Sequence, residues 1–151
     1  MSHAILTATP TVDTNIFASG DLIGATFITF SNGLLAGKHC GQIRHAMIVD
    51  NSVNTADIDV LFFNTAPSNS TYTENAALTL HATDQSYLIG ETTLAKHTSL
   101  AASSIHQTAL ADATYIPFIL TSDNLYAVLI SRGTPTFTAT GVTLRIAISF
   151  D

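Results

Sequence analysis

Hydrophobic and polar residues alternate along the last part of the chain. Every second position from 142 to 150 is apolar, and Thr, Arg, Ala and Ser residues stand between these positions. Side chains of a β-strand point alternately to the two faces of a sheet, so a period of two is typical of a strand with one buried face. The pattern predicts a strand over residues 142–150.

Two internal runs carry apolar residues at consecutive positions. Residues 124–132 (NLYAVLISR) are apolar on both faces, which indicates a central strand covered on both sides or a strand in an interface. Residues 58–63 (IDVLFF) form a second β-rich run, which stops at a loop-like stretch from Asn64 to Ser70. We expect both runs to be strands.

Shorter β-rich runs separated by turn residues account for most of the remaining chain. They predict strands at residues 4–9, 21–30, 41–50, 77–81, 86–89, 105–109 and 115–120, with a brief strand at 136–140 after the Gly133–Pro135 turn. Thr92–Ser104 is rich in Ala and Leu, but β-branched and Ser residues interrupt it and no cap is evident. We expect one helical turn there at most.

Many short strands with frequent turns predict an all-β fold. The arrangement we expect is an antiparallel, jelly-roll-like β-sandwich with at most one short helical turn. The 151 residues fit one domain. We expect residues 1–16 to form an N-terminal arm or edge strand, and residues 17–151 to form a single sandwich domain.

Charged residues are scarce. They make up 11% of the chain, against about 25% in ordinary soluble proteins, while 46% of residues are hydrophobic. A surface built from Thr, Ser, Asn and Ala loses little on desolvation, which favours assembly with other proteins. The same composition also suits a secreted or adhesive β-protein.

The charge balance and the apolar segments disfavour two classes of partner. The net charge of −6, with five Lys and Arg residues in all, offers no basic stripe for direct nucleic-acid binding. No run of about 18 apolar residues is present that could cross a membrane, and residues 1–13 do not resemble a secretory signal. A single cysteine excludes an intrachain disulfide and suits a reducing cytosol.

Residues with catalytic or metal-binding chemistry do not form a known motif. Cys40 follows His39, but neighbours on a strand point to opposite faces, so a small buried thiol is the favoured interpretation. Asp57 and Asp59 would share a strand face, as a solvating acidic pair or as a calcium or acid–base pair. We predict no catalytic residue, no metal site and no cofactor. The six histidines lack metal-ligand spacing: His3, His39, His45, His81, His97 and His106.

The tyrosines are the remaining candidates for recognition, because the chain has no Trp. Together with Tyr72, three tyrosines in β-rich runs could form a sugar-binding platform, but they fit more simply as rim or interface residues. The residues that we predict at an interface are Tyr87, Tyr115, Tyr126 and Arg132.

Several segments taken together resemble small structural proteins encoded among the head genes of tailed bacteriophages. They are Asp13-Thr14-Asn15 with Ala18–Gly24, Ile58–Phe63 with Pro67, and Leu125-Tyr126 leading to Ser131–Thr134, so the resemblance runs through most of the chain. It implies a jelly-roll or related sandwich of the capsid decoration (cement) type, which sits on the outer capsid as a dimer or trimer and ties major capsid subunits together.

The leading hypothesis is a non-enzymatic virion structural protein. Its partners would be the major capsid protein or another virion protein and further copies of itself, and it would reach the capsid surface from the host cytoplasm. Residues 1–16 could add as a strand to a neighbour's sheet edge. The alternatives are a head-fibre or tail-associated carbohydrate- or receptor-binding module, and a hydrolase whose site is assembled only in the fold.

Overall fold

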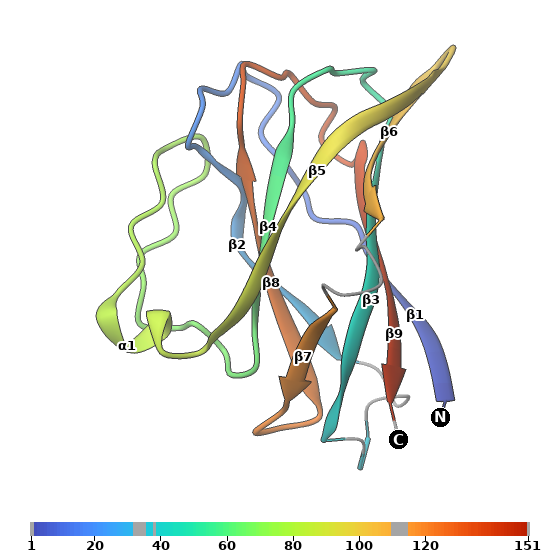
Figure 1. Ribbon diagram of the computed structural model, residues 1–151. Coiled ribbons are helices and arrows are strands. Elements are labelled where there is room, and N and C mark those ends of the chain that lie inside the picture. The colour runs from blue at the N-terminus through green and yellow to red at the C-terminus, as the bar shows by residue number, and fades with distance from the viewer. Residues whose placement is uncertain (1, 32–35, 38, 110–114, 151) are drawn as a thin grey trace.

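The computed structural model describes residues 2–31, 36–37, 39–109 and 115–150. This part of the chain forms nine strands and one short helix (Figure 1). In chain order they are β1 (Ser2–Ala8), β2 (Leu22–Ser31), β3 (Cys40–Asp50), β4 (Ile58–Phe63), α1 (Ala82–Gln85), β5 (Leu88–Leu100), β6 (Ser103–Ala109), β7 (Ile116–Ile119), β8 (Asn124–Ser131) and β9 (Val142–Phe150).

The strands pair antiparallel in the order β1-β9-β3-β6-β5-β4-β8-β2, with β7 beside β3. β5 belongs to two ladders, because residues 88–94 pair with β4 and residues 95–100 pair with β6. Figure 1 shows β5 running diagonally from one layer to the other. The first layer is therefore β1-β9-β3-β6 and the second is β4-β8-β2. The prediction of an antiparallel, all-β, jelly-roll-like sandwich is confirmed.

The core lies between the two layers. The predicted alternation of β9 is confirmed, because Val142, Leu144, Ile146 and Ile148 are at most 1% exposed. They belong to the same buried cluster as Phe62 of β4 and the inward side chains of β8. Burying one such side chain contributes about 1.5–3 kcal/mol.

A second hydrophobic cluster lies on the other face of the second layer. Its strand residues are Leu22, Leu61, Phe63, Tyr126, Val128 and Ile130. Residues 64–87, which we call the flap, cover this face with Ala66, Tyr72, Leu78, Leu80 and Tyr87. β4 and β8 are thus buried on both faces. For β8 this is one of the two alternatives that its apolar run predicted, a central strand covered on both sides; for β4 the sequence predicted only a strand.

The helical segment expected at residues 92–104 is wrong. These residues lie in β5, the turn after it and the start of β6, where cross-strand pairing and the burial of Thr92 and Leu94 override helix propensity. The helix lies instead at Ala82–Gln85. His81 caps it, since its Nδ1 accepts a hydrogen bond from the Thr83 N–H at 3.2 Å.

Two of the short strands expected are also wrong. Residues 136–140 form no strand, because the backbone N–H groups of Thr136 and Thr138 bond to side chains of another connection. Residues 77–81 make only isolated bridges, at Ala77 and Thr79. The division of the chain at residue 16 stays a prediction; within it, β1 pairs along one side with β9.

Gly41 lies where three strands meet, since β3 pairs there with both β7 and β9. A Cβ at this position would meet the backbone carbonyl oxygen of Ser149 and, at 2.7 Å, the ring of Phe118. A backbone atom in a ladder cannot move aside cheaply. Glycine is therefore required by space and not by an unusual dihedral angle.

We predict that Gly41→Ala lowers the free energy of unfolding by about 1–3 kcal/mol, the usual cost of overpacking. Gly90→Ala is the matched control, because its Cβ would meet only the Ile116 side chain, at 2.9 Å, which can change rotamer. Urea unfolding of the two variants checks this. Equal losses in both would contradict the role of the Ser149 carbonyl.

Candidate interaction surfaces

The outward side of the first layer is more exposed than that of the second. Along β1, β9, β3 and β6 the side chains alternate between the core and the outside, as the register of the four strands requires. The outward positions that are exposed or half-exposed, which we call the outer face, are His3, Ile5, Thr7, His45, Met47, Val49, Ile105, Gln107, Thr143, Arg145 and Ala147.

Apolar side chains are neighbours on the outer face. Ile5 lies opposite Ala147, and Val49 lies opposite Ile105 in the next pair of strands. Side chains at opposite positions of an antiparallel pair are in contact range. Ile5 is 67% exposed. Arg145, opposite Met47, carries the one fixed charge among these eleven positions.

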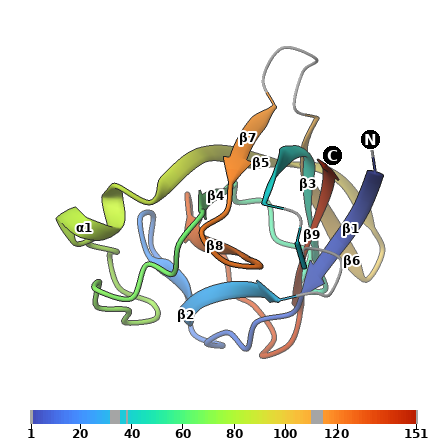
Figure 2. The ribbon, with the colours of Figure 1, turned by 90° about the horizontal axis from the view of Figure 1, so that it is seen from below.

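The flap closes the corresponding side of the second layer. Figure 2 shows the segment around α1 on the side of the molecule away from β1 and β9. Tyr72 helps to hold it, since its hydroxyl donates to the Pro67 carbonyl oxygen at 2.6 Å and its ring packs edge-on against Phe27. Burial raises the pKa of Tyr72 to about 12.

Asp84 anchors the flap from inside. Its fully buried carboxylate accepts hydrogen bonds from the backbone N–H and the side chain of both Asn69 and Ser70, over 2.5–3.3 Å. Burial alone would raise the pKa of Asp84, but these hydrogen bonds outweigh it and hold the pKa below its ordinary value of 3.8. The charged carboxylate therefore stabilises the folded flap.

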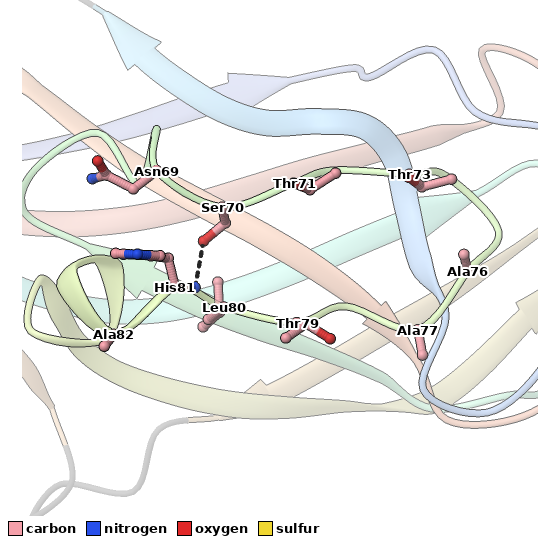
Figure 3. A pocket seen from close by; sticks show the side chains of 10 residues that line it. All are labelled: Asn69, Ser70, Thr71, Thr73, Ala76, Ala77, Thr79, Leu80, His81 and Ala82. Carbon is pink, nitrogen blue, oxygen red and sulfur yellow. Dashed lines mark hydrogen bonds between the residues drawn. The ribbon is translucent and has the colours of Figure 1, made fainter.

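A hollow of about 630 Å³ opens in the flap. Figure 3 shows its two runs side by side, joined by the hydrogen bond from the His81 backbone N–H to the Ser70 hydroxyl at 2.9 Å. The lining mixes hydroxyl and amide side chains with Ala, Leu80 and the His81 imidazole, and it includes no Tyr, Phe or Trp ring on which a sugar could stack. The lining residues are Asn69, Ser70, Thr71, Thr73, Ala76, Ala77, Thr79, Leu80, His81 and Ala82.

A Ser, a His and an Asp meet at the end of the sandwich where β3 and β6 pair. The Ser104 hydroxyl lies 3.0 Å from His106 Nε2, and Asp50 Oδ2 lies 3.9 Å from the same nitrogen. In a catalytic triad the carboxylate bonds the other ring nitrogen, Nδ1, which here has no hydrogen-bond partner. All three residues are 0% exposed. This geometry and burial do not fit nucleophilic catalysis.

The cluster shifts the proton affinity of His106. Burial lowers the pKa of His106 below its ordinary value of 6.5, and the nearby carboxylates of Asp50 and Asp57 oppose this only in part. Sequence reasoning missed the cluster because Asp50 and His106 come from strands far apart in the chain. One available signal was that Ser104 and His106, two residues apart in a strand, share a face.

Asp50 also shapes the turn that follows β3. Its carboxylate accepts hydrogen bonds from the Ser52 and Asn54 backbone N–H groups at 2.8 and 2.9 Å. Val53 between them has φ of +56°. A β-branched residue is strained in this left-handed region, so the turn persists because Asp50 holds both of its neighbours.

The environments of Cys40 and of the acidic pair Asp57 and Asp59 differ from those predicted from the sequence. Cys40 is exposed rather than buried, because β3 begins there at the rim of the first layer. Asp59 is not a solvated carboxylate. It is 8% exposed and accepts hydrogen bonds from Arg132 Nε at 2.5 Å and from the Thr93 hydroxyl at 2.7 Å. Asp57 is exposed and its backbone oxygen accepts the Arg132 N–H.

The six histidines and the acidic residues form no candidate metal site within the described ranges. No group of three or more His, Cys, Asp or Glu side chains lies close enough there to hold a metal ion. In the same part of the chain, no helix has the length and hydrophobicity needed to cross a membrane.

The four predicted interface residues lie in different places. Tyr126 is buried under the flap beside Phe27, and half-buried Tyr87 packs against the same cluster. Tyr115, before β7, lies 3.7 Å from the guanidinium of Arg44. Arg132 pairs with Asp59 at the end of β8 away from Tyr126. The structure brings Tyr87 and Tyr126 to one cluster but not the other two, and their role at an interface stays a prediction.

Comparison with solved structures gives matches to virus particles at low TM-scores. No model of a known protein family matches the sequence, and no curated protein is significantly similar to it. One structural match is a virus-like particle of the extra small virus of the giant freshwater prawn Macrobrachium rosenbergii, with 9% identity over 99% of this chain and 79% of that chain, at a TM-score of 0.38.

Two further matches are plant viruses. Turnip yellow mosaic virus has 10% identity over 99% of this chain and 92% of that chain, at a TM-score of 0.33. Desmodium yellow mottle tymovirus has 14% identity over 97% of this chain and 79% of that chain, at a TM-score of 0.29. All three scores are low, and the comparisons assign the chain to no family.

We predict that Asp84→Asn lowers the free energy of unfolding at neutral pH by about 1–3 kcal/mol, because the buried amide cannot accept all four hydrogen bonds. The folded-state pKa of Asp84 is lowered, so its contribution is present above about pH 3.8 and is lost as the pH falls below that value. The gap between wild type and variant should therefore shrink in acid.

Urea unfolding at about pH 7 and about pH 3 measures this gap. Glu91→Gln is the control, since Glu91 is an exposed carboxylate on β5. A gap that is the same at both pH values would show that the charge on Asp84 does not hold the flap.

We predict that Val53→Asn raises the free energy of unfolding by about 1 kcal/mol, because Asn tolerates the left-handed region that strains Val. Val53→Ala should gain less, since alanine is not β-branched but keeps a Cβ penalty at positive φ. Thermal unfolding compares the three proteins. A variant with Asn that melts below the wild type would contradict strain at this turn.

Proposed function

We propose that this chain is a structural protein of a virus particle, and specifically a capsid decoration (cement) protein that binds the major capsid protein. The observation that carries the proposal is the outer face, where apolar side chains lie together with a single fixed charge, Arg145. The resemblance of the sequence to structural proteins of tailed bacteriophages supports the same role.

The physical argument is the low cost of desolvating this face. Moving a fixed charge out of water costs several kcal/mol unless a partner compensates it, and the centres of protein interfaces are depleted of charge. Ile5, opposite Ala147, and Val49, opposite Ile105, can be covered without that cost, whereas Met47 lies opposite Arg145. Ile5 is also placed as an anchor, because most of its side chain is exposed in the isolated chain.

Assembly on a symmetric shell would strengthen a modest contact. Each copy that binds two capsid subunits gains a second contact at high effective concentration, and copies of the chain that associate as a dimer or trimer gain further contacts. The protein would then be found at the surface of the particle after synthesis in the host cytoplasm. Its presence in purified particles is the direct check on this location.

The decisive experiment is co-sedimentation with capsids assembled without this protein. We predict that wild type binds and raises the temperature at which the capsids dissociate, and that Ile5→Lys weakens binding about tenfold or more, equivalent to about 1.4 kcal/mol. Ile16→Lys is the matched control, because Ile16 is 65% exposed in the connection after β1 and lies outside the outer face.

The outcomes test separately whether the outer face is the contact and whether the protein has a virion role. If both variants bind as wild type does, the outer face is not the contact. If wild type itself neither sediments with capsids nor stabilises them, the virion role is wrong. Circular dichroism of each variant confirms that the exposed substitution leaves the fold intact.

A carbohydrate- or receptor-binding role is the second candidate, and the hollow in the flap favours it. The hydroxyls of Thr71, Thr73 and Thr79 could bond a polar ligand, although the hollow has no Tyr, Phe or Trp ring for stacking. Glycan-array binding that falls about three- to tenfold in Thr79→Val, which loses one hydroxyl, would support this role. An array without hits would exclude it for the glycans tested.

A further inference from the structure

One end of the sandwich is tied together by side chains and not by a β-ladder. The connection between β3 and β4 contributes Asn54, whose amide bonds both the N–H and the carbonyl of Thr136 at 3.0 Å. Ser52 accepts the Thr138 N–H at 2.9 Å. At this end Ser52 and Asn54 therefore hold the connection between β8 and β9, together with one backbone bond from the Asn51 N–H to the Gly141 carbonyl oxygen at 2.9 Å. Elsewhere the same connection is held by backbone bonds from Val12 and Phe17 and by buried Phe137.

Asp50 holds these two side-chain donors and acceptors in position. Besides the Ser52 and Asn54 N–H groups, its carboxylate accepts the Asn54 side-chain amide at 2.8 Å. The Ser104 hydroxyl lies 3.5 Å from Asp50 and 3.1 Å from the Asn54 carbonyl oxygen. The buried cluster of Ser104 and His106 therefore contacts Asp50, and Asp50 in turn positions the Ser52 and Asn54 side chains that bind the second connection.

The hydrogen bonds of Ser104 indicate which ring nitrogen of neutral His106 carries the hydrogen. A serine hydroxyl has one hydrogen, and the acceptors beside Ser104, the Asp50 carboxylate and the Asn54 carbonyl, can only accept. Ser104 donates to this pair, so its oxygen accepts from Nε2–H of His106. The ring nitrogen Nδ1 is then the unprotonated one, and it has no partner.

A proton added at Nδ1 would place a positive charge in a site that water does not reach. Four groups act on that charge: Asp50 on β3, Asp57 on the following connection and the Ala56 backbone carbonyl favour it, while Lys96, opposite His106 on β5, opposes it. Asp50 Oδ2 lies 3.9 Å from Nε2, and a closer approach to the charged ring would draw the carboxylate away from Ser52 and Asn54, whose hydrogen bonds it already accepts. Such a movement weakens the side-chain ties at this end.

We propose that proton uptake by His106 acts as an acid-sensitive release of this end of the sandwich. On protonation the turn at Val53 leaves its strained conformation and the Thr136 and Thr138 N–H groups lose their side-chain acceptors, while the two-layer core, to which buried Phe137 belongs, stays folded. Residues 54–56 and 133–135 line a hollow of about 240 Å³ at this end, so the surface presented there changes with pH.

The direction of the pH dependence follows from the burial of the ring. Burial holds the pKa of His106 below its ordinary value of 6.5 in the closed form, so an open form in which water reaches the ring binds the proton more readily. The closed form is therefore fully favoured above about pH 6.5 and loses ground as the pH falls below it. Each pH unit in this window changes the ratio of closed to open form up to about tenfold.

The test is amide hydrogen exchange followed by NMR at about pH 7.5 and about pH 5, with rates expressed as protection factors so that intrinsic exchange cancels. We expect protection at Ser52, Asn54, Thr136 and Thr138 to fall about tenfold at the lower pH. Core amides such as those of Phe62 and Val128 should keep their protection.

Variants make the result specific to one ring. His106→Gln cannot take up the proton, so its protection at these amides should not depend on pH, whatever its absolute value. His81→Gln, at the exposed cap of α1, should retain the full wild-type dependence. Asp50→Asn should show low protection at both pH values, because it weakens the turn directly.

The proposal is overturned if wild-type protection at the four amides is the same at both pH values, or if the loss persists in His106→Gln. An independent readout is the NMR titration of the His106 ring itself. A ring that titrates at or above its ordinary pKa while these amides stay protected would also overturn it.

Discussion

Two-sided burial of β4 and β8 is the constraint on which the rest of the molecule depends. Their inward side chains meet β9 and β3 across the core, and their outward side chains form the cluster under the flap. The flap has no ladder of its own beyond isolated bridges, so it needs Asp84 and Tyr72 to hold it down. Charge and hydrogen bonding thus serve the hydrophobic burial of the second layer.

The first layer is organised in the opposite way. Its inward side is apolar except for Asp50, Ser104 and His106 at one end, and its outward side carries Ile, Val, Met, Ala, Thr, His and Gln with a single Arg. The low content of charged residues is therefore seen on one particular surface, the outer face of the first layer. The flap covers the outward side of the second layer, and the outer face of the first layer is exposed. The functional proposal therefore concerns β1, β9, β3 and β6.

Local patterns predicted the parts of the fold in which each residue's environment follows from its neighbours in sequence. The alternation in β9, the run of β8 that is apolar on both faces and the β-rich run of β4 belong to this group. Features that depend on distant pairing were not predictable: Thr92–Ser104 has helical composition, yet β4 and β6 recruit it as strand. Cys40 is exposed because β3 happens to begin at a rim.

The candidate surfaces show the same limit. Tyr126 looked like an interface residue because tyrosine is common at interfaces, but nothing local indicates that residues 64–87 fold back over it. The contact of Asp50 with His106 depends on the register of β3 with β6, which pairs Asp50 with Ser104. Composition predicted a surface suited to contact, and only the pairing of strands says which face carries it.

β5 has a mechanical consequence. Its first half pairs with β4 in one layer and its second half pairs with β6 in the other, so the covalent backbone of a single strand links the two layers. A load that pulls the layers apart is carried along peptide bonds, and neither layer can slide past the other without shearing a ladder. The sandwich should therefore resist separation of its layers better than the packing between them alone would allow.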